Sequence, residues 1–108
     1  MNINSQTYVS LALLPKLLQR EGNKKSAVIN ISSVSALEPR AMMAIYAATK
    51  AFNLHLGSCF TDLYRERIDV LTVTPNSVRS QMNSGRYVYA INAEDFVKTC
   101  LNQLGWVS

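Results

Sequence analysis

A tyrosine and a lysine four residues apart, Tyr46 and Lys50, are the residues of this sequence best suited to acid–base chemistry. If the segment from Ala41 onward is helical, the two side chains share one face of the helix. An ammonium group held beside a phenol favours the phenolate, provided that the lysine itself stays charged. A tyrosine that gives and takes a proton near neutral pH is a general acid/base. By spacing alone, an ordinary helix with a surface lysine is an equally good interpretation.

A third candidate, Ser33, follows an apolar run. We expect a strand over residues 26–31, because a short apolar run between turn residues is typical of a strand buried on both faces of a parallel sheet. Ligands of open α/β sheets bind beyond the carboxyl ends of the strands. Ser33 therefore comes at the end where its hydroxyl could steady the oxygen of a reacting carbonyl.

The elements around these residues alternate between helix and strand. Leucines at helical spacing, extended by Tyr8, predict a helix over 2–20 with a bend at Pro15 and a left-handed cap at Gly22. A second helix over 41–65 has small residues at 47, 48 and 51 that either reflect helix propensity or allow a close approach, and its apolar side is marked by Phe52, Leu56, Phe60 and Leu63.

The remaining residues complete this alternation. We expect a second buried strand over 68–73, a turn at 74–76, and a final helix that Asn92 caps, with an inner stripe of Phe96, Val97, Cys100, Leu101 and Leu104 and an end at Gly105. Residues 81–91 lack periodicity and are predicted to be a mobile segment that contacts substrate. The order helix, strand, helix, strand, helix predicts an α/β fold with parallel strands.

Composition narrows the class of protein. With 108 residues, 48% of them apolar, the chain suits one small globular domain. The net charge of +4 comes from scattered positions without interleaved aromatics, which argues against nucleic-acid binding.

Cys59 and Cys100 stand alone and are predicted to be buried free thiols, His55 is expected at the surface, and no metal site is predicted. We recognise no secretory leader or membrane span, so the location is cytoplasmic unless segments outside these residues anchor the chain.

Three successive segments resemble the short-chain dehydrogenase/reductase family: Asn30-Ile-Ser-Ser33, Tyr46-Ala-Ala-Thr-Lys50-Ala-Phe52 and Val73-Thr-Pro75-Asn-Ser-Val-Arg-Ser80. Ser33 precedes Tyr46 by thirteen residues, as the catalytic pair does in that family. The resemblance extends along nearly the whole chain and implies a partial Rossmann-like, doubly wound parallel sheet, with residues 1–108 as its C-terminal part. The family's Gly-rich turn matches nothing here, because the glycines at 22, 57, 85 and 105 are isolated. The N-terminal nucleotide-binding half is therefore expected to be absent, and the isolated chain to bind cofactor poorly.

The resemblance also implies roles for individual residues in an NAD(P)(H)-dependent oxidoreductase acting on a carbonyl or alcohol. Tyr46 would transfer the proton, Lys50 would support it and hydrogen-bond the nicotinamide ribose, and Ser33 would hold the substrate oxygen. Asn2 matches the family's fourth member, whose backbone supports a water relay to the lysine; Asn4 is the near miss.

A further implied set of residues contacts the cofactor. The family's Pro-Gly-x-Val-x-Thr reads Pro75-Asn76-Ser-Val78-Arg-Ser80 here, so Pro75, Val78 and Ser80 would contact the carboxamide and pyrophosphate. Asn76 stands in place of the glycine and can also accept a left-handed turn.

Leu13-Leu-Pro-Lys16, Ala51-Phe52 and residues 94–105 are most similar to the branch of very-long-chain 3-oxoacyl-CoA reductases and related 17β-hydroxysteroid dehydrogenases. This implies a 3-oxoacyl-CoA or steroid substrate, NADP(H) in preference to NAD(H), association with the endoplasmic reticulum membrane, and a homodimer through the two long helices. A second hypothesis is a truncated or inactive relative that serves as a binding or dimerisation module. A Gly-rich turn encoded upstream in frame would favour the enzyme.

Overall fold

The computed structural model describes residues 2–22, 24–38, 41–79 and 90–104. The main elements are α1 (Asn2–Leu18), β1 (Ser26–Ile31), α2 (Ala44–Leu63), β2 (Ile68–Val73) and α3 (Ala93–Gln103). Two 3-10 turns, Val34–Ala36 and Ala41–Met43, and two short strands, β3 (Val78–Arg79) and β4 (Ile91–Asn92), lie between them. The predicted alternation of helices and strands is confirmed.

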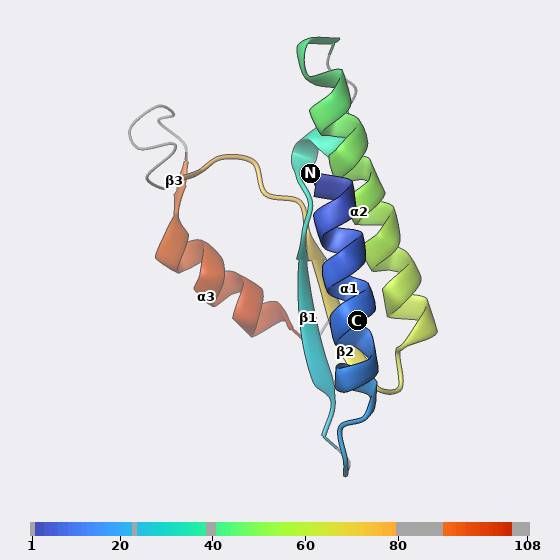
Figure 1. The fold of residues 1–108 in the computed structure, drawn as a ribbon. Helices are drawn as coiled ribbons and strands as arrows, with labels where there is room; N and C mark the ends of the chain where they lie inside the picture. The colour runs from blue at the N-terminus through green and yellow to red at the C-terminus, as the bar shows by residue number, and fades with distance from the viewer. Residues whose placement is uncertain (1, 23, 39–40, 80–89, 105–108) are drawn as a thin grey trace.

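The strands β1 and β2 are parallel, as predicted, with Ser26 opposite Ile68 and Ile31 opposite Val73. Figure 1 shows α1 and α2 together on one side of this pair and α3 on the other, which is the doubly wound arrangement. Because both strands end at the same level, the loops that follow them meet: the Ser32 N–H donates to the Val73 carbonyl at 2.8 Å, and the Val34 N–H to the Pro75 carbonyl at 3.1 Å. These bonds build one continuous rim at the carboxyl end of the sheet.

The hydrophobic core is centred on β2, where Ile68, Val70 and Leu71 are buried. The prediction that the strand at 26–31 is buried on both faces is wrong. Of its six residues only Ser26 and Asn30 are buried, and Ile31 is 51% exposed. The physical reason is cover, since both strands are edge strands of a two-stranded sheet but α2 and α3 pack mainly against β2.

The first helix differs from its prediction in extent and in orientation. It continues through Pro15 and ends at Leu18 rather than at residue 20. Gly22 has the expected left-handed conformation, with φ of 82°, but it lies four residues beyond the last helical residue and so does not cap the helix. Tyr8 and Leu11 were expected on the inner stripe but are exposed. The inner face instead includes Leu14 and Leu17, which line a small cavity with residues of β1 and α2.

The second helix begins at Ala44, after a 3-10 turn over residues 41–43, and ends at Leu63 rather than 65. Leu63 is exposed, contrary to its place on the predicted apolar side. It lies six residues after the buried Gly57 and so about 120° away around the helix.

The third helix has the predicted cap, because the Asn92 side chain accepts a hydrogen bond from the Glu94 N–H at 2.8 Å. Its inner stripe is narrower than predicted, since Cys100 is buried while Val97 and Leu101 are exposed. Asn92 also ends β4, which pairs in parallel with β3. These two-residue strands were not predicted, and the rest of the expected mobile segment, together with Gly105, lies outside the described residues.

Candidate active site

The helix α2 brings Tyr46 and Lys50 together on one face. The Lys50 Nζ lies over the Tyr46 ring at 5.7 Å from its centroid, a distance at which an ammonium is attracted to the aromatic face. Tyr46 is 39% exposed and Lys50 is half-buried. A phenol accessible to a bound molecule therefore has a cation as its neighbour, as predicted from the helical period.

The ammonium group of Lys50 is held at the end of β1. Its Nζ donates a hydrogen bond to the Ile31 carbonyl at 3.4 Å. Within the described ranges Lys50 forms no ion pair with a carboxylate. Since an ammonium has three donors, two of them remain for other acceptors beside the phenol.

Ser33 lies at the carboxyl end of β1, in the loop where it was predicted. It is 7% exposed and caps the 3-10 turn that follows, its Oγ accepting from the Ser35 N–H at 3.2 Å. This bond uses a lone pair of the hydroxyl and not its hydrogen. The hydroxyl thus keeps a donor that can hold a substrate oxygen.

Asn2 contacts α2 through its side chain. Its Nδ2 donates to Thr49 Oγ1 at 3.1 Å, and that hydroxyl donates to the Tyr46 carbonyl at 2.8 Å. The structure therefore links Asn2 to the turn that carries Tyr46 and Lys50, through Thr49. The near miss Asn4 is exposed.

The predicted cofactor residues lie beyond β2, and the structure describes them in part. Pro75 precedes β3, which contains Val78, and its carbonyl joins the loop after β1 as described above. Ser80 lies outside the described residues. The left-handed turn considered for Asn76 is not adopted, because no residue other than glycine has a positive φ within the described ranges.

A hollow of about 550 Å³ lies beside the Ser33 loop, lined by Ser35, Ala36 and five alanines from residue 41 to residue 51. The small side chains considered in the sequence thus leave open apolar space next to the candidate site. Their role in the close approach of a cofactor or a second helix remains a prediction.

Other candidates do not join this site. His55 is exposed, Cys59 is a half-buried free thiol, and Cys100 is buried in α3. The described residues contain no cluster of three His, Cys, Asp or Glu side chains that could hold a metal ion, and no helix among them is long and apolar enough to cross a membrane.

Three polar residues near the site were missed by the sequence interpretation: Asn30, Ser32 and Thr49. Asn30 is 6% and Ser32 2% exposed, and both bond to backbone carbonyls of α2. The sequence feature that could have identified Asn30 is a polar amide inside an apolar strand, since such a group is buried only when it has hydrogen-bond partners.

Comparison with known proteins gives a consistent result. Residues 1–87 match the model of the short chain dehydrogenase family. The chain is 31% identical over 108 residues to the very-long-chain 3-oxoacyl-CoA reductase of Rattus norvegicus and 32% identical over 89 residues to 17-beta-hydroxysteroid dehydrogenase type 3 of Mus musculus. These alignments cover 97% and 79% of this chain but 34% and 28% of the relatives, so the chain spans about a third of their length.

Two solved structures share the fold. A short-chain dehydrogenase from Sphingobium yanoikuyae in complex with NADPH aligns with a TM-score of 0.77 and 28% identity over 94% of this chain and 41% of that one. The bulky-bulky ketone specific alcohol dehydrogenase from Comamonas testosteroni aligns with a TM-score of 0.76, also at 28% identity, over 94% of this chain and 39% of that one.

Proposed function

Because this chain belongs to the short-chain dehydrogenase family, we propose that it supplies the catalytic groups of an NAD(P)(H)-dependent oxidoreductase that interconverts a carbonyl and an alcohol. Residues 1–108 are then the C-terminal part of the catalytic domain. The observation that carries the proposal is the ammonium of Lys50 over the Tyr46 ring, at the carboxyl end of the strand that leads to Ser33.

In the reducing direction, Tyr46 donates its phenolic proton to the substrate oxygen while the Ser33 hydroxyl holds that oxygen. When bound, a nicotinamide cofactor would supply the hydride for the carbonyl carbon. The positive charge of Lys50 stabilises the phenolate left on Tyr46, and the same groups act in reverse when an alcohol is oxidised. Asn2, linked to this turn through Thr49, is the proposed fourth member of the site.

The donors present suit a nicotinamide nucleoside. The two Lys50 donors not used by Ile31 match the acceptor oxygens of a ribose diol. By family resemblance, Tyr46 would lie beside the same ribose, and Pro75, Val78 and Ser80 would contact the carboxamide and pyrophosphate. We favour NADP(H) over NAD(H), in keeping with the NADPH named for the Sphingobium neighbour.

A titration of the 108-residue chain with NADPH tests how much of the cofactor site these residues supply. We expect weak binding, because the sequence has no Gly-rich turn for the pyrophosphate. Calorimetry measures the affinity directly, and a dissociation constant in the micromolar range would contradict this expectation.

For the substrate we propose a 3-oxoacyl-CoA or a steroid, following the names of the relatives. The alanine-lined hollow beside Ser35 supports an apolar substrate, because its small side chains leave room for hydrocarbon. From the same resemblance we propose that the protein associates with the endoplasmic reticulum membrane, through segments outside these residues.

The test is Tyr46→Phe in the longest product of the gene that contains these residues, assayed for NADPH-dependent reduction of a 3-oxoacyl-CoA and of a 17-ketosteroid. Loss of the proton donor should lower kcat by at least about 10²-fold without loss of the fold. Tyr64→Phe is the matched control, since Tyr64 packs on Phe60 near the opposite end of α2. Equal turnover in the two variants would remove Tyr46 from the mechanism.

A second candidate function is a binding or dimerisation module without catalysis. Exposed apolar side chains on α1, including Tyr8, Val9 and Leu11, favour it, because they form a surface suited to a second copy of the chain. The homodimer proposed for the enzyme would use the same helix together with α2. A stable dimer by sedimentation, combined with no turnover in the longest gene product, would select the module.

A further inference from the structure

Two buried polar side chains connect the strand β1 to the helix α2 directly below the candidate site. The Ser32 Oγ donates to the Lys50 carbonyl at 2.6 Å, and the Asn30 Nδ2 donates to the Asn53 carbonyl at 2.6 Å. Both acceptors are helix backbone, so the bonds hold the helix itself rather than a side chain on it.

The spacing of the donors matches the spacing of the acceptors. Asn30 and Ser32 are two residues apart and so lie on one face of an extended chain, whereas Lys50 and Asn53 are three apart and adjacent on the helix surface. Two such bonds fix the position of α2 along the direction of β1 and its rotation about its own axis.

Close packing one turn further along keeps the helix against the sheet. A Cβ at Gly57 would lie under 3.0 Å from Asn30 Nδ2 and Thr72 Oγ1, which real Cβ atoms essentially never do. Asn30 also bonds to Thr72 Oγ1 at 3.3 Å and accepts from Gln6. Its amide thus contacts α1, α2 and β2. Apolar side chains at this place would pack the elements together but would not fix their relative orientation as directional hydrogen bonds do.

From these contacts we infer that Ser32 and Asn30 are positioning residues, which hold Lys50 and Tyr46 level with Ser33 along the direction of β1. The link is Lys50, whose carbonyl accepts from Ser32 while its Nζ donates to Ile31, the residue before Ser32. The inference rests on the proposed function for its catalytic consequence. The Ser32 hydroxyl donates to the helix, so its effect on the reaction passes through Lys50.

The experiment compares Ser32→Ala with Ser58→Ala. Ser58 is a matched control because its Oγ also donates to a carbonyl of α2, that of Leu54 at 3.2 Å, but on an exposed face and within the helix. Nuclear Overhauser contacts between the Lys50 ε-methylene and the backbone of residues 31–32 are measured in the 108-residue chain. Steady-state kinetics are measured on the longest gene product.

We expect Ser32→Ala to lose these contacts and to lower kcat by about 10- to 100-fold, the scale of a displacement of about 1 Å in an active site, with KM for the carbonyl substrate unchanged. Ser58→Ala should alter none of these. Ser32→Cys, which has a somewhat larger side chain but keeps a weak donor, should fall between wild type and Ser32→Ala, and replaces it if that variant fails to fold.

The inference is overturned if either the Lys50 contacts or kcat in the folded Ser32 variant match those of Ser58→Ala. If the wild-type product has no turnover, the proposed function fails. The nuclear Overhauser contacts alone then decide whether Ser32 positions Lys50.

Discussion

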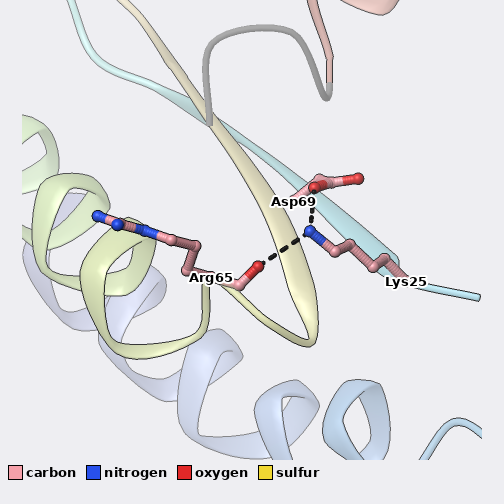
Figure 2. A network of polar contacts seen from close by, with 3 residues as sticks. All are labelled: Lys25, Arg65 and Asp69. Atoms are coloured by element: carbon pink, nitrogen blue, oxygen red, sulfur yellow. Dashed lines mark hydrogen bonds and ion pairs between the residues drawn. The ribbon is translucent and has the colours of Figure 1, made fainter. Parts of the chain in front are cut away.

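Two lysines at opposite ends of the same sheet each donate a hydrogen bond to a backbone carbonyl, but their second partners differ. At the amino end, the Lys25 Nζ donates to the Arg65 carbonyl at 3.0 Å and pairs with the Asp69 carboxylate at 3.4 Å (Figure 2). At the carboxyl end, the Lys50 Nζ donates to the Ile31 carbonyl and lies over the Tyr46 ring. The carboxylate balances one ammonium locally, whereas the other lies beside a phenol and forms no ion pair with a carboxylate within the described residues.

The side chains that donate to helix carbonyls near the two lysines also differ in charge. At the amino end of the sheet, Arg67 NH2 donates to the Leu18 and Arg20 carbonyls at 2.5 and 3.5 Å, where a cation also complements the C-terminal dipole of α1. Near Lys50, the donors to helix carbonyls are the neutral side chains of Ser32 and Asn30. Cations therefore bond to helix carbonyls at one end of the sheet, while at the other end neutral groups do so, beside the cation that we propose for the chemistry.

Lys50→Met against Lys25→Met is the strongest test of this contrast. Removing the ammonium beside Tyr46 should lower kcat/KM of the longest gene product by about 10²-fold or more, about 2.7 kcal/mol of transition-state stabilisation. Lys25→Met should leave kcat/KM nearly unchanged and affect only stability. Steady-state assays on both variants check this, and equal losses would show that the two lysines do not differ in role.

Much of the carboxyl end of the sheet could be predicted from the sequence, because local rules determine the structure there. The pairing of Tyr46 with Lys50 follows from the helical period, and the place of Ser33 follows from the end of an apolar strand. The helix cap at Asn92 and the left-handed Gly22 follow equally from local chemistry.

What could not be predicted depends on tertiary contacts. A run of leucines did not show which edge of the helical stripe faces the sheet, so Tyr8 and Leu11 were assigned to the wrong side. Nothing local distinguishes Ser32, which donates to α2, from Ser33, which caps a turn. The strand β1 has the composition of a buried strand, but the helices α2 and α3 pack mainly against β2. The strands β3 and β4 are too short to show a period.

Gly57→Ala should give the next largest effect, on the stability provided by the packing of α2 against the two strands. The added methyl would overlap Thr72 and Asn30, so we expect the free energy of unfolding to fall by about 1–3 kcal/mol, as is usual for overpacking. Urea denaturation of the 108-residue chain measures it, with the exposed Ser58→Ala expected within about 0.5 kcal/mol of wild type. An unchanged midpoint for Gly57→Ala would mean that α2 is free to move away from the strands.

The smallest effect is expected at the amino end, from Asp69→Asn. Lys25 and Asp69 side chains are 44% and 27% exposed, and pairs of this kind contribute about 0.2–1 kcal/mol to stability. Because Lys25 keeps its bond to the Arg65 carbonyl, the loss should lie low in this range and shrink further at about 1 M salt, where screening is strong.

The control is Asp62→Asn, which removes a more exposed ion pair with the side chain of Arg65, at 3.1 Å and with exposures of 80% and 63%. We expect it to have less effect than Asp69→Asn in urea denaturation at low salt. If Asp69→Asn instead lowers stability by more than Gly57→Ala, the carboxylate at Lys25 is a principal support of the fold. The expectation that this partly exposed ion pair contributes little to stability would then be wrong.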